Sequence, residues 1–324
     1  MKKGNIIPFI GISIFIYILY RVGFTRILNS LKNINLKLIP LIILILVVYY
    51  FLASLKWYTI LRTQNIKIKL TQAIKFYLIG NFYGFITPSR IGSLIRAKYV
   101  QELTNHKSVV GCSSSIVIER MFDIITIFLF AIPATLFLTK EFTNLFTEVI
   151  IIFTILLITI ILIMKKESSK KIFKLLFKIV PNQYKQTLRE AFYNFHETIP
   201  NFKKLILPFI ITIITWFVSF TETFITSKAV GMQVPYLQFI TFTSIATIIG
   251  LIPITMSGLG TREATWIILF KRYNTLPESI IAMSLLSLFI GAIIPSIIGF
   301  CLSLSHKRKT YNPPSPYENK KNEV

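Results

Sequence analysis

Seven charged residues lie in or beside apolar stretches that are long enough to be buried in a membrane. They form three groups: Arg90 with Arg96, Glu119 with Arg120 and Asp123, and Arg262 with Glu263. A charged side chain at the centre of a bilayer costs about 3 kcal/mol on insertion scales, so it usually faces the protein interior or an aqueous cavity. Arginines there can contact a phosphate, and the acids can contact a cationic headgroup or the arginines. These groups are the candidate binding residues.

The first group lies beside an interruption in an apolar helix. The run that begins at Ala73 meets Asn81, a candidate ligand contact, and then Thr87 and Pro88. Proline lacks a backbone donor and biases the preceding residue away from helix, so the helix should break here. Irregular backbone at membrane depth is tolerated only beside protein or a water-filled cavity. The stretch from Gly80 to Lys98 is therefore either a binding site or a helix end whose arginines reach the headgroups.

The second group has the spacing of a helical face. Glu119 and Asp123 are four residues apart, and Arg120 can reach Asp123 three residues on. One interpretation is a self-neutralising ion pair that anchors the helix. In the other, one acid neutralises Arg120 and the second orients Arg90 or a substrate.

The third group follows a second interrupted segment, and the two interruptions resemble each other. PSRIGSLIRA (88–97) and MSGLGTREA (256–264) each combine a small residue, an aliphatic residue, Gly, Ser or Thr, and Arg before Ala. Paired interrupted helices indicate a transporter-type substrate site, although two glycine-containing breaks can also coincide. Gly92, Gly258 and Gly260 would allow a ligand to approach the backbone closely.

Composition decides the class of protein. Of 324 residues, 53% are hydrophobic and 15% are charged. Several apolar runs reach the roughly 20 residues that span a bilayer. We predict an all-α, polytopic integral membrane helix bundle of about eight hydrophobic spans, including two interrupted or re-entrant helices. The net charge of +23 lies mostly between these runs, which favours anionic lipid headgroups as partners and excludes nucleic acid.

The charge distribution also predicts domains and orientation. Residues 1–306 form the membrane domain, and 307–324 form a disordered cytoplasmic tail. Ten Lys and Arg lie in the loop 165–204, which is predicted to be basic, amphipathic and cytoplasmic by the positive-inside rule.

Two spans carry specific expectations. One runs from Leu38 to Tyr58, with Trp57 and Tyr58 as interfacial anchors. The other is a helix of about 30 residues from Val109 to Leu138, near 45 Å long, kinked at Pro133.

Signals for catalysis are absent from the sequence. It contains no G-x-x-x-x-G-K-[ST], H-E-x-x-H or G-x-S-x-G motif. Two cysteines and three scattered histidines cannot form a metal set. We therefore predict no catalytic residue, metal or cofactor, and an enzyme is disfavoured.

The motifs together resemble a known family. P88-S89-R90-I91-G92 with Arg96, then E119-R120-x-x-D123, then Pro253 before G258-L259-G260-x-x-E263 are similar to the transmembrane domain of lysylphosphatidylglycerol synthases. The resemblance covers roughly residues 5 to 305. It implies a flippase-like domain of the cell membrane that moves an aminoacylated or otherwise modified lipid between leaflets.

The chain departs from this family in three ways. The soluble aminoacyl-transferring domain has no counterpart, so we expect a stand-alone member. Ser93 replaces an acid after the first glycine, and Met256-Ser257-Gly258 replaces Pro-Gly-Gly.

The sequence therefore predicts translocation of an anionic or modified phospholipid, or of a polyprenyl-linked lipid. The alternative is a non-transporting membrane partner that recruits a separate lipid- or glycan-modifying enzyme through the loop 165–204. The lipid, the energy source and the oligomeric state are left open by the sequence.

Overall fold

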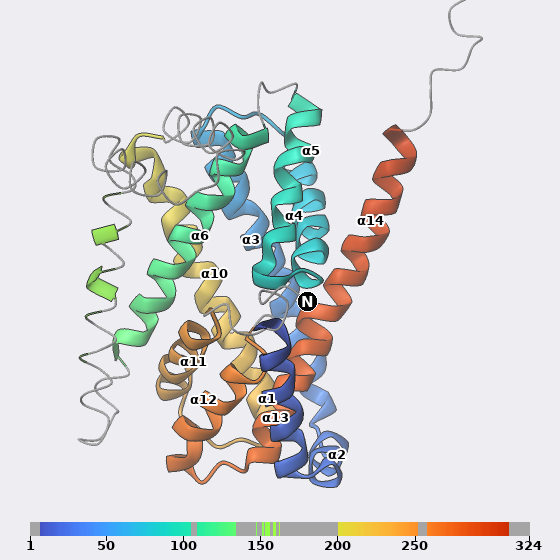
Figure 1. Ribbon diagram of the computed structural model, residues 1–324, viewed down its shortest axis with the longest axis vertical. Coiled ribbons are helices and arrows are strands. Elements are labelled where there is room, and N and C mark those ends of the chain that lie inside the picture. Colours follow the sequence, from blue (N-terminus) through green and yellow to red (C-terminus); the bar gives the residue numbers. More distant parts are fainter. Residues whose placement is uncertain are drawn as a thin grey trace, which may run out of the picture.

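The computed structural model describes residues 7–104, 109–133, 147, 151, 153–155, 158–159, 162, 200–251 and 258–310. These residues form a bundle of helices without a strand, which confirms the predicted all-α membrane architecture (Figure 1). Several predictions lie outside this part of the chain: most of the expected span at 149–164, residues 165–199 of the basic loop, Pro253, and residues 311–324 of the tail.

Three long apolar segments form the frame of the described bundle. They are η2 (Leu36–Leu38) with α3 (Ile39–Thr63), α10 (Phe202–Ala229), and α13 (Pro277–Leu288) continued by the π-helical η7 (Phe289–Ile293) and α14 (Ile294–Thr310). Their apolar stretches, 36–63, 202–229 and 277–305, have 28 or 29 residues each, enough to cross the roughly 30 Å hydrocarbon core. α3 packs mainly on α10, and α14 packs on α4 (Leu70–Phe85). The total of about eight spans stays a prediction.

The N-terminal helices contain a break that the sequence analysis did not predict. α1 (Ile7–Val22) and α2 (Phe24–Lys32) meet at Gly23 and are bent by 79°. Gly23 has φ +93°, a conformation that glycine adopts without a side-chain penalty. The bent pair is a fourth candidate span within the described residues, and α2 packs against α13.

The first predicted interruption is present. α4 ends at Phe85, Thr87 is extended, and the 3-10 helix η3 (Pro88–Leu94) leads into α5 (Ile95–Thr104). The Thr87 hydroxyl donates to the carbonyl oxygen of Tyr83 (2.7 Å) and accepts the backbone N–H of Gly92 (2.8 Å). One side chain thus replaces the helical hydrogen bonds that Pro88 prevents.

The helix that carries the acidic motif is shorter than expected. α6 (Val109–Ala131) has 23 residues and passes into a 3-10 turn at 132–133, so it ends before Pro133 instead of kinking there. Its length is about 35 Å at 1.5 Å per residue, close to the bilayer core. The α-helical part is thus shorter than the predicted 30 residues, and residues 134–138 of that prediction lie outside the described residues.

The second interruption separates α11 (Tyr236–Leu251) from α12 (Thr261–Phe270), which is followed by η6 (Lys271–Tyr273). α11 packs on α6 and α12. A core of buried aromatic residues joins these helices, including Phe239, Phe242, Trp266 and Phe270. In Figure 1 this region occupies the lower half of the bundle, whereas α5 lies in the upper half.

Candidate functional site

Arg96 lies in the first turn of α5, directly after the first interruption. Its side chain is 1% exposed, and its Nη2 is 2.9 Å from Oε2 of Glu119 on α6. The guanidinium also stacks between the rings of Trp57 (4.8 Å) and Tyr77 (4.9 Å). A methyl group at Gly80 would overlap the stem of Arg96, so the glycine in α4 makes room for this side chain.

Lys56 completes the neutralisation of the two acids. Its Nζ is 2.7 Å from Oδ1 of Asp123 and 3.4 Å from Oε1 of Glu119. Two cations, Lys56 and Arg96, thus face two acids, and all four residues are at most 6% exposed. Buried charges are tolerated only when they are paired in this way. We call Lys56, Arg96, Glu119 and Asp123 the buried quartet.

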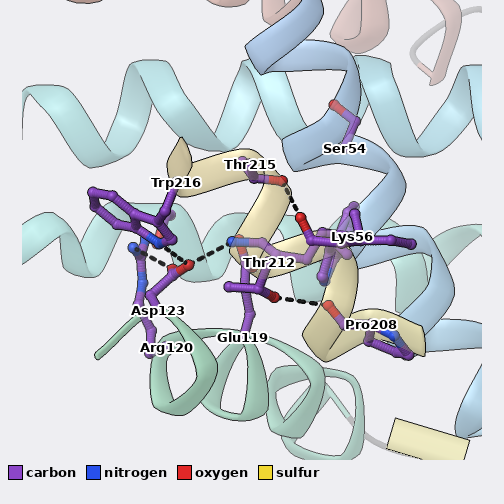
Figure 2. Close-up of polar contacts among 12 residues, drawn as sticks. Ser54, Lys56, Glu119, Arg120, Asp123, Pro208, Thr212, Thr215 and Trp216 are labelled. Atoms are coloured by element: carbon purple, nitrogen blue, oxygen red, sulfur yellow. Dashed lines mark hydrogen bonds and ion pairs between the residues drawn. The ribbon is translucent and has the colours of Figure 1, made fainter. Parts of the chain in front are cut away.

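Asp123 joins three helices. Figure 2 shows its carboxylate contacted by Lys56 of α3, by Trp216 of α10, whose Nε1 donates over 2.8 Å, and by Arg120 of its own helix. The contact with Arg120 is longer, 3.7 Å from Nη1 to Oδ2. The Arg120–Asp123 pair predicted within α6 is therefore present, but the shortest contacts of both acids come from residues of other helices.

A small cavity opens beside the buried quartet. Its lining residues are Tyr77, Gly80, Asn81, Gly84, Arg90, Ser93, Arg96 and Arg120. It measures about 20 Å³, room for one water-sized group. Among these lining residues three are arginines and none is acidic. The cavity is thus suited to the tip of an anionic group.

The arginines of the cavity differ in how far they are neutralised. Arg90 is exposed, has φ +55°, and forms no ion pair with any residue that the structure describes. The Arg120 side chain is 41% exposed and donates over 3.4 Å to the Ser93 hydroxyl. Nη1 of Arg96 is buried without a hydrogen-bond partner in the described part of the chain. Arg90 and Arg120 are the cations that a ligand can reach.

Charge is distributed unevenly along the chain. The first 101 residues hold 14 Lys and Arg and no acid. Any acid that pairs with a cation of α3, α4 or α5 therefore comes from later in the sequence. For Lys56 and Arg96 the acids come from α6.

Two further predicted residues position the cavity wall. A methyl group at Gly92 would overlap the carbonyl of Tyr83, so the glycine lets η3 pack against α4. Asn81 lines the cavity and its Nδ2 is 3.4 Å from Oγ of Ser296, which ties α4 to α14. The group that approaches Gly92 closely is thus the backbone carbonyl of Tyr83, whereas the sequence predicted a ligand there.

The charged residues of the second interruption, Arg262 and Glu263, pair with each other. Nη2 of Arg262 is 3.1 Å from Oε1 of Glu263, and the guanidinium stacks on Trp266 at 4.7 Å. Oε2 of Glu263 accepts the backbone N–H of Gly260 over 2.6 Å, and its other oxygen accepts the Ser284 hydroxyl. Glu263 therefore caps α12 in addition to neutralising Arg262.

The described residues of the second interruption do not line the cavity. Gly258, Gly260, Arg262 and Glu263 are absent from its lining. Gly258 has φ +80° and packs against Gly250 of α11. The nearby acid Glu222 of α10 is 6% exposed and accepts hydrogen bonds from Thr226 (3.0 Å) and Thr223 (3.3 Å).

Sequence reasoning missed Lys56, Trp57 and Trp216. The expectation that Trp57 is an interfacial anchor was wrong, because its side chain is fully buried and Nε1 donates to Ser115 over 3.0 Å. Lys56 and Trp57 come six residues or more before the end of α3 at Thr63, so they lie inside the helix. A lysine within an apolar run was the available signal.

Comparison with known proteins identifies relatives over almost the whole chain. The family model described as the lysylphosphatidylglycerol synthase TM region matches residues 6–299. A UPF0104 membrane protein of Pyrococcus horikoshii is 21% identical over 330 residues, covering 95% of this chain and 98% of the relative. A UPF0104 membrane protein of Methanocaldococcus jannaschii is 24% identical over 329 residues, covering 95% and 96%.

Proposed function

The chain belongs to the lysylphosphatidylglycerol synthase TM family, and on that premise we propose that it moves an anionic or modified lipid between the leaflets of the cell membrane. The observation that carries the proposal is the cavity at the first interruption, whose charged lining residues are three arginines without an acid. A phosphate group is the part of a lipid that matches such a lining.

The arginines have different roles in this proposal. Arg90 and Arg120 contact the phosphate, because they are the accessible cations of the cavity. Arg96 positions the wall through Glu119, Trp57 and Tyr77. Arg262 serves the packing of α12, in contrast to the phosphate contact that its sequence motif predicts.

The size of the cavity limits how the lipid binds. At about 20 Å³ it admits a phosphate oxygen and not a headgroup, so the rest of the lipid stays at the mouth. The long contacts of Arg120, 3.4 Å to Ser93 and 3.7 Å to Asp123, are ones that a phosphate can replace. Passage of the headgroup then requires η3 and α5 to move relative to α6.

Orientation and partners follow from charge. The loop 165–204 and the C-terminus lie on the cytoplasmic side in this proposal, as the positive-inside rule predicts. Anionic lipid headgroups are the partners, and a separate lipid- or glycan-modifying enzyme is the partner under the non-transporting alternative.

The test is lipid transport in vesicles of defined composition. The protein is reconstituted with a trace of fluorescent phospholipid, and an impermeant quencher reports how fast the label changes leaflet. Arg90→Gln and Arg120→Gln should each slow transport about tenfold or more, since a hydrogen bond to a charged group is worth about 1.5–3 kcal/mol.

The matched control is Arg62→Gln. Arg62 also ends on an exposed guanidinium, but it stacks on Tyr58 (5.3 Å) at the end of α3 and does not line the cavity. Its removal should leave the rate unchanged. Equal rates for all three variants would remove the site assignment, and a wild-type protein that moves no lipid would favour the non-transporting alternative.

A further inference from the structure

The charges around the cavity can be counted. Within the described residues, the buried quartet contains two cations and two acids and is neutral as a unit. Its shortest contacts, 2.7 Å for Lys56 with Asp123 and 2.9 Å for Arg96 with Glu119, lie inside the quartet. Arg90 and Arg120 are outside it, and the acid that Arg120 contacts at 3.7 Å, Asp123, is already counted in the quartet.

Other acids of the described chain do not change this count. Glu102 pairs with Lys98, Glu263 pairs with Arg262, Glu222 is bonded by two threonines, and Glu278 lies in the first turn of α13. None of these four lines the cavity. Counted over the described residues, the cavity therefore carries a surplus of two positive charges.

We infer that the preferred ligand of this cavity is a lipid phosphomonoester, whose headgroup carries two negative charges, and not a phosphodiester, which carries one. The inference rests on the proposed function, since it names the substrate class of the same site. A ligand of charge minus two neutralises both arginines, whereas a ligand of charge minus one leaves one of them without a partner.

The shape of the cavity supports the same choice. A monoester ends in three free oxygens, whereas a diester has substituents on both sides of its phosphorus and offers two. With about 20 Å³ available, one oxygen of a monoester can enter toward Arg96 while its other two oxygens stay at the mouth with Arg90 and Arg120. A diester that places one oxygen in the cavity has a single free oxygen left for these two arginines.

Ser93 maintains the surplus of two. Its side chain is buried and its Oγ is 3.4 Å from Nη2 of Arg120. A carboxylate at this position would lie within ion-pair distance of Arg120 and would neutralise it. The variant Ser93→Asp should therefore lower the surplus to one without removing an arginine.

The experiment is competition binding to the purified protein in detergent, with a fluorescent phosphatidate displaced by unlabelled lipids. Phosphatidate and phosphatidylglycerol with the same acyl chains are compared at pH 8, and a polyprenyl monophosphate is the second monoester. We expect both monoesters to bind about tenfold or more tightly than phosphatidylglycerol, because one further charge acts on two arginines. Which monoester binds more tightly identifies the lipid tail.

Two controls test the charge count: a change of pH with the wild-type protein, and a set of variants at pH 8. A phosphomonoester loses its second charge near pH 6, so the preference of the wild-type protein should shrink to a few fold at pH 5. Arg120→Gln and Ser93→Asp should shrink it at pH 8, and Arg120→Lys should retain it. Equal affinities for phosphatidylglycerol and both monoesters at pH 8 would overturn the inference.

The outcome separates this inference from the proposed function. Vesicle transport of phosphatidylglycerol together with equal binding of all lipids would overturn the monoester assignment and leave transport in place. A monoester preference in a protein that moves no lipid would overturn transport and support the assignment.

Discussion

The two helix interruptions look alike in sequence and differ in how their arginines are neutralised. Arg96 finds its acid on another helix, 23 residues away, whereas the acid of Arg262 is the next residue in the chain. The first interruption therefore depends on the packing of α3, α5, α6 and α10, and the second depends mainly on α12 itself. A short motif thus determines the local backbone, while its charge environment is set by the tertiary structure.

The two interruptions also differ in the net charge that remains after their ion pairs are counted. The first interruption has two accessible arginines beyond its neutral buried quartet. At the second, Glu263 neutralises Arg262, so this pair leaves no net charge. An anion is therefore attracted to one interruption and not to the other, and four variants can test this contrast.

The largest expected effect is that of Glu119→Gln. The change leaves Lys56 and Arg96 buried with one acid, and breaking a buried ion pair costs about 3–5 kcal/mol. The midpoint of thermal unfolding in detergent should fall sharply. Glu102→Gln is the control, since its contact with Lys98 is 3.8 Å long and exposed and should matter little. Equal midpoints would mean that burial of the quartet contributes nothing.

Gly92→Ala tests the packing of the first interruption. Its methyl group would overlap the backbone carbonyl of Tyr83, which cannot move aside as a side chain can. Overpacking of this kind costs about 1–3 kcal/mol. Gly291→Ala in η7 is the control, because its methyl group would lie 3.6 Å from Leu46, an ordinary contact. Unfolding midpoints of the two variants should differ, and the lipid transport rate should fall for Gly92→Ala.

Glu263→Gln tests whether the second interruption is structural. The amide keeps one acceptor for Gly260 and weakens the bonds from Arg262 and Ser284, at a cost of about 1–2 kcal/mol. Stability should fall while the lipid preference of the remaining folded protein stays that of the wild type. A change in preference would show that the second interruption also contacts the ligand.

The smallest expected effect on lipid transport is that of Arg262→Gln. It removes a partly exposed guanidinium that stacks on Trp266 and pairs with the buried Glu263, so the stability of the protein should fall. Lipid transport by the folded protein should stay close to the wild-type rate, because Arg262 does not line the cavity. If Arg262→Gln abolishes transport and Arg120→Gln does not, the second interruption binds the lipid and the first is structural.

Much of the fold follows from the sequence for clear reasons. Pro88 cannot continue a helix, so the end of α4 was predictable, and the apolar runs at 36–63, 202–229 and 277–305 are long enough to span. It was also predictable that Arg96 and Glu119 each have a charged partner, because an unpaired charge within an apolar run is costly.

The remainder needed the tertiary structure. Lys56 stands near the end of its apolar run, where a lysine can reach water, and only the packing of α3 on α6 shows that it is buried. Trp57 has the composition of an interfacial residue and instead supports Arg96. The similarity of the two interruptions suggested a shared cavity, but Arg262 has a local partner that the motif could not distinguish from a ligand.

The absence of acids from the first 101 residues has a consequence for biosynthesis. Lys56 precedes Glu119 by 63 residues, so α3 reaches the membrane before the acid that neutralises its lysine exists. At roughly 5–20 residues per second, this interval lasts about 3–13 s. During that time Lys56 and then Arg96 must remain near water or the insertion machinery. The arrival of α6 in the bilayer is thus the event that allows α3 and α5 to dock.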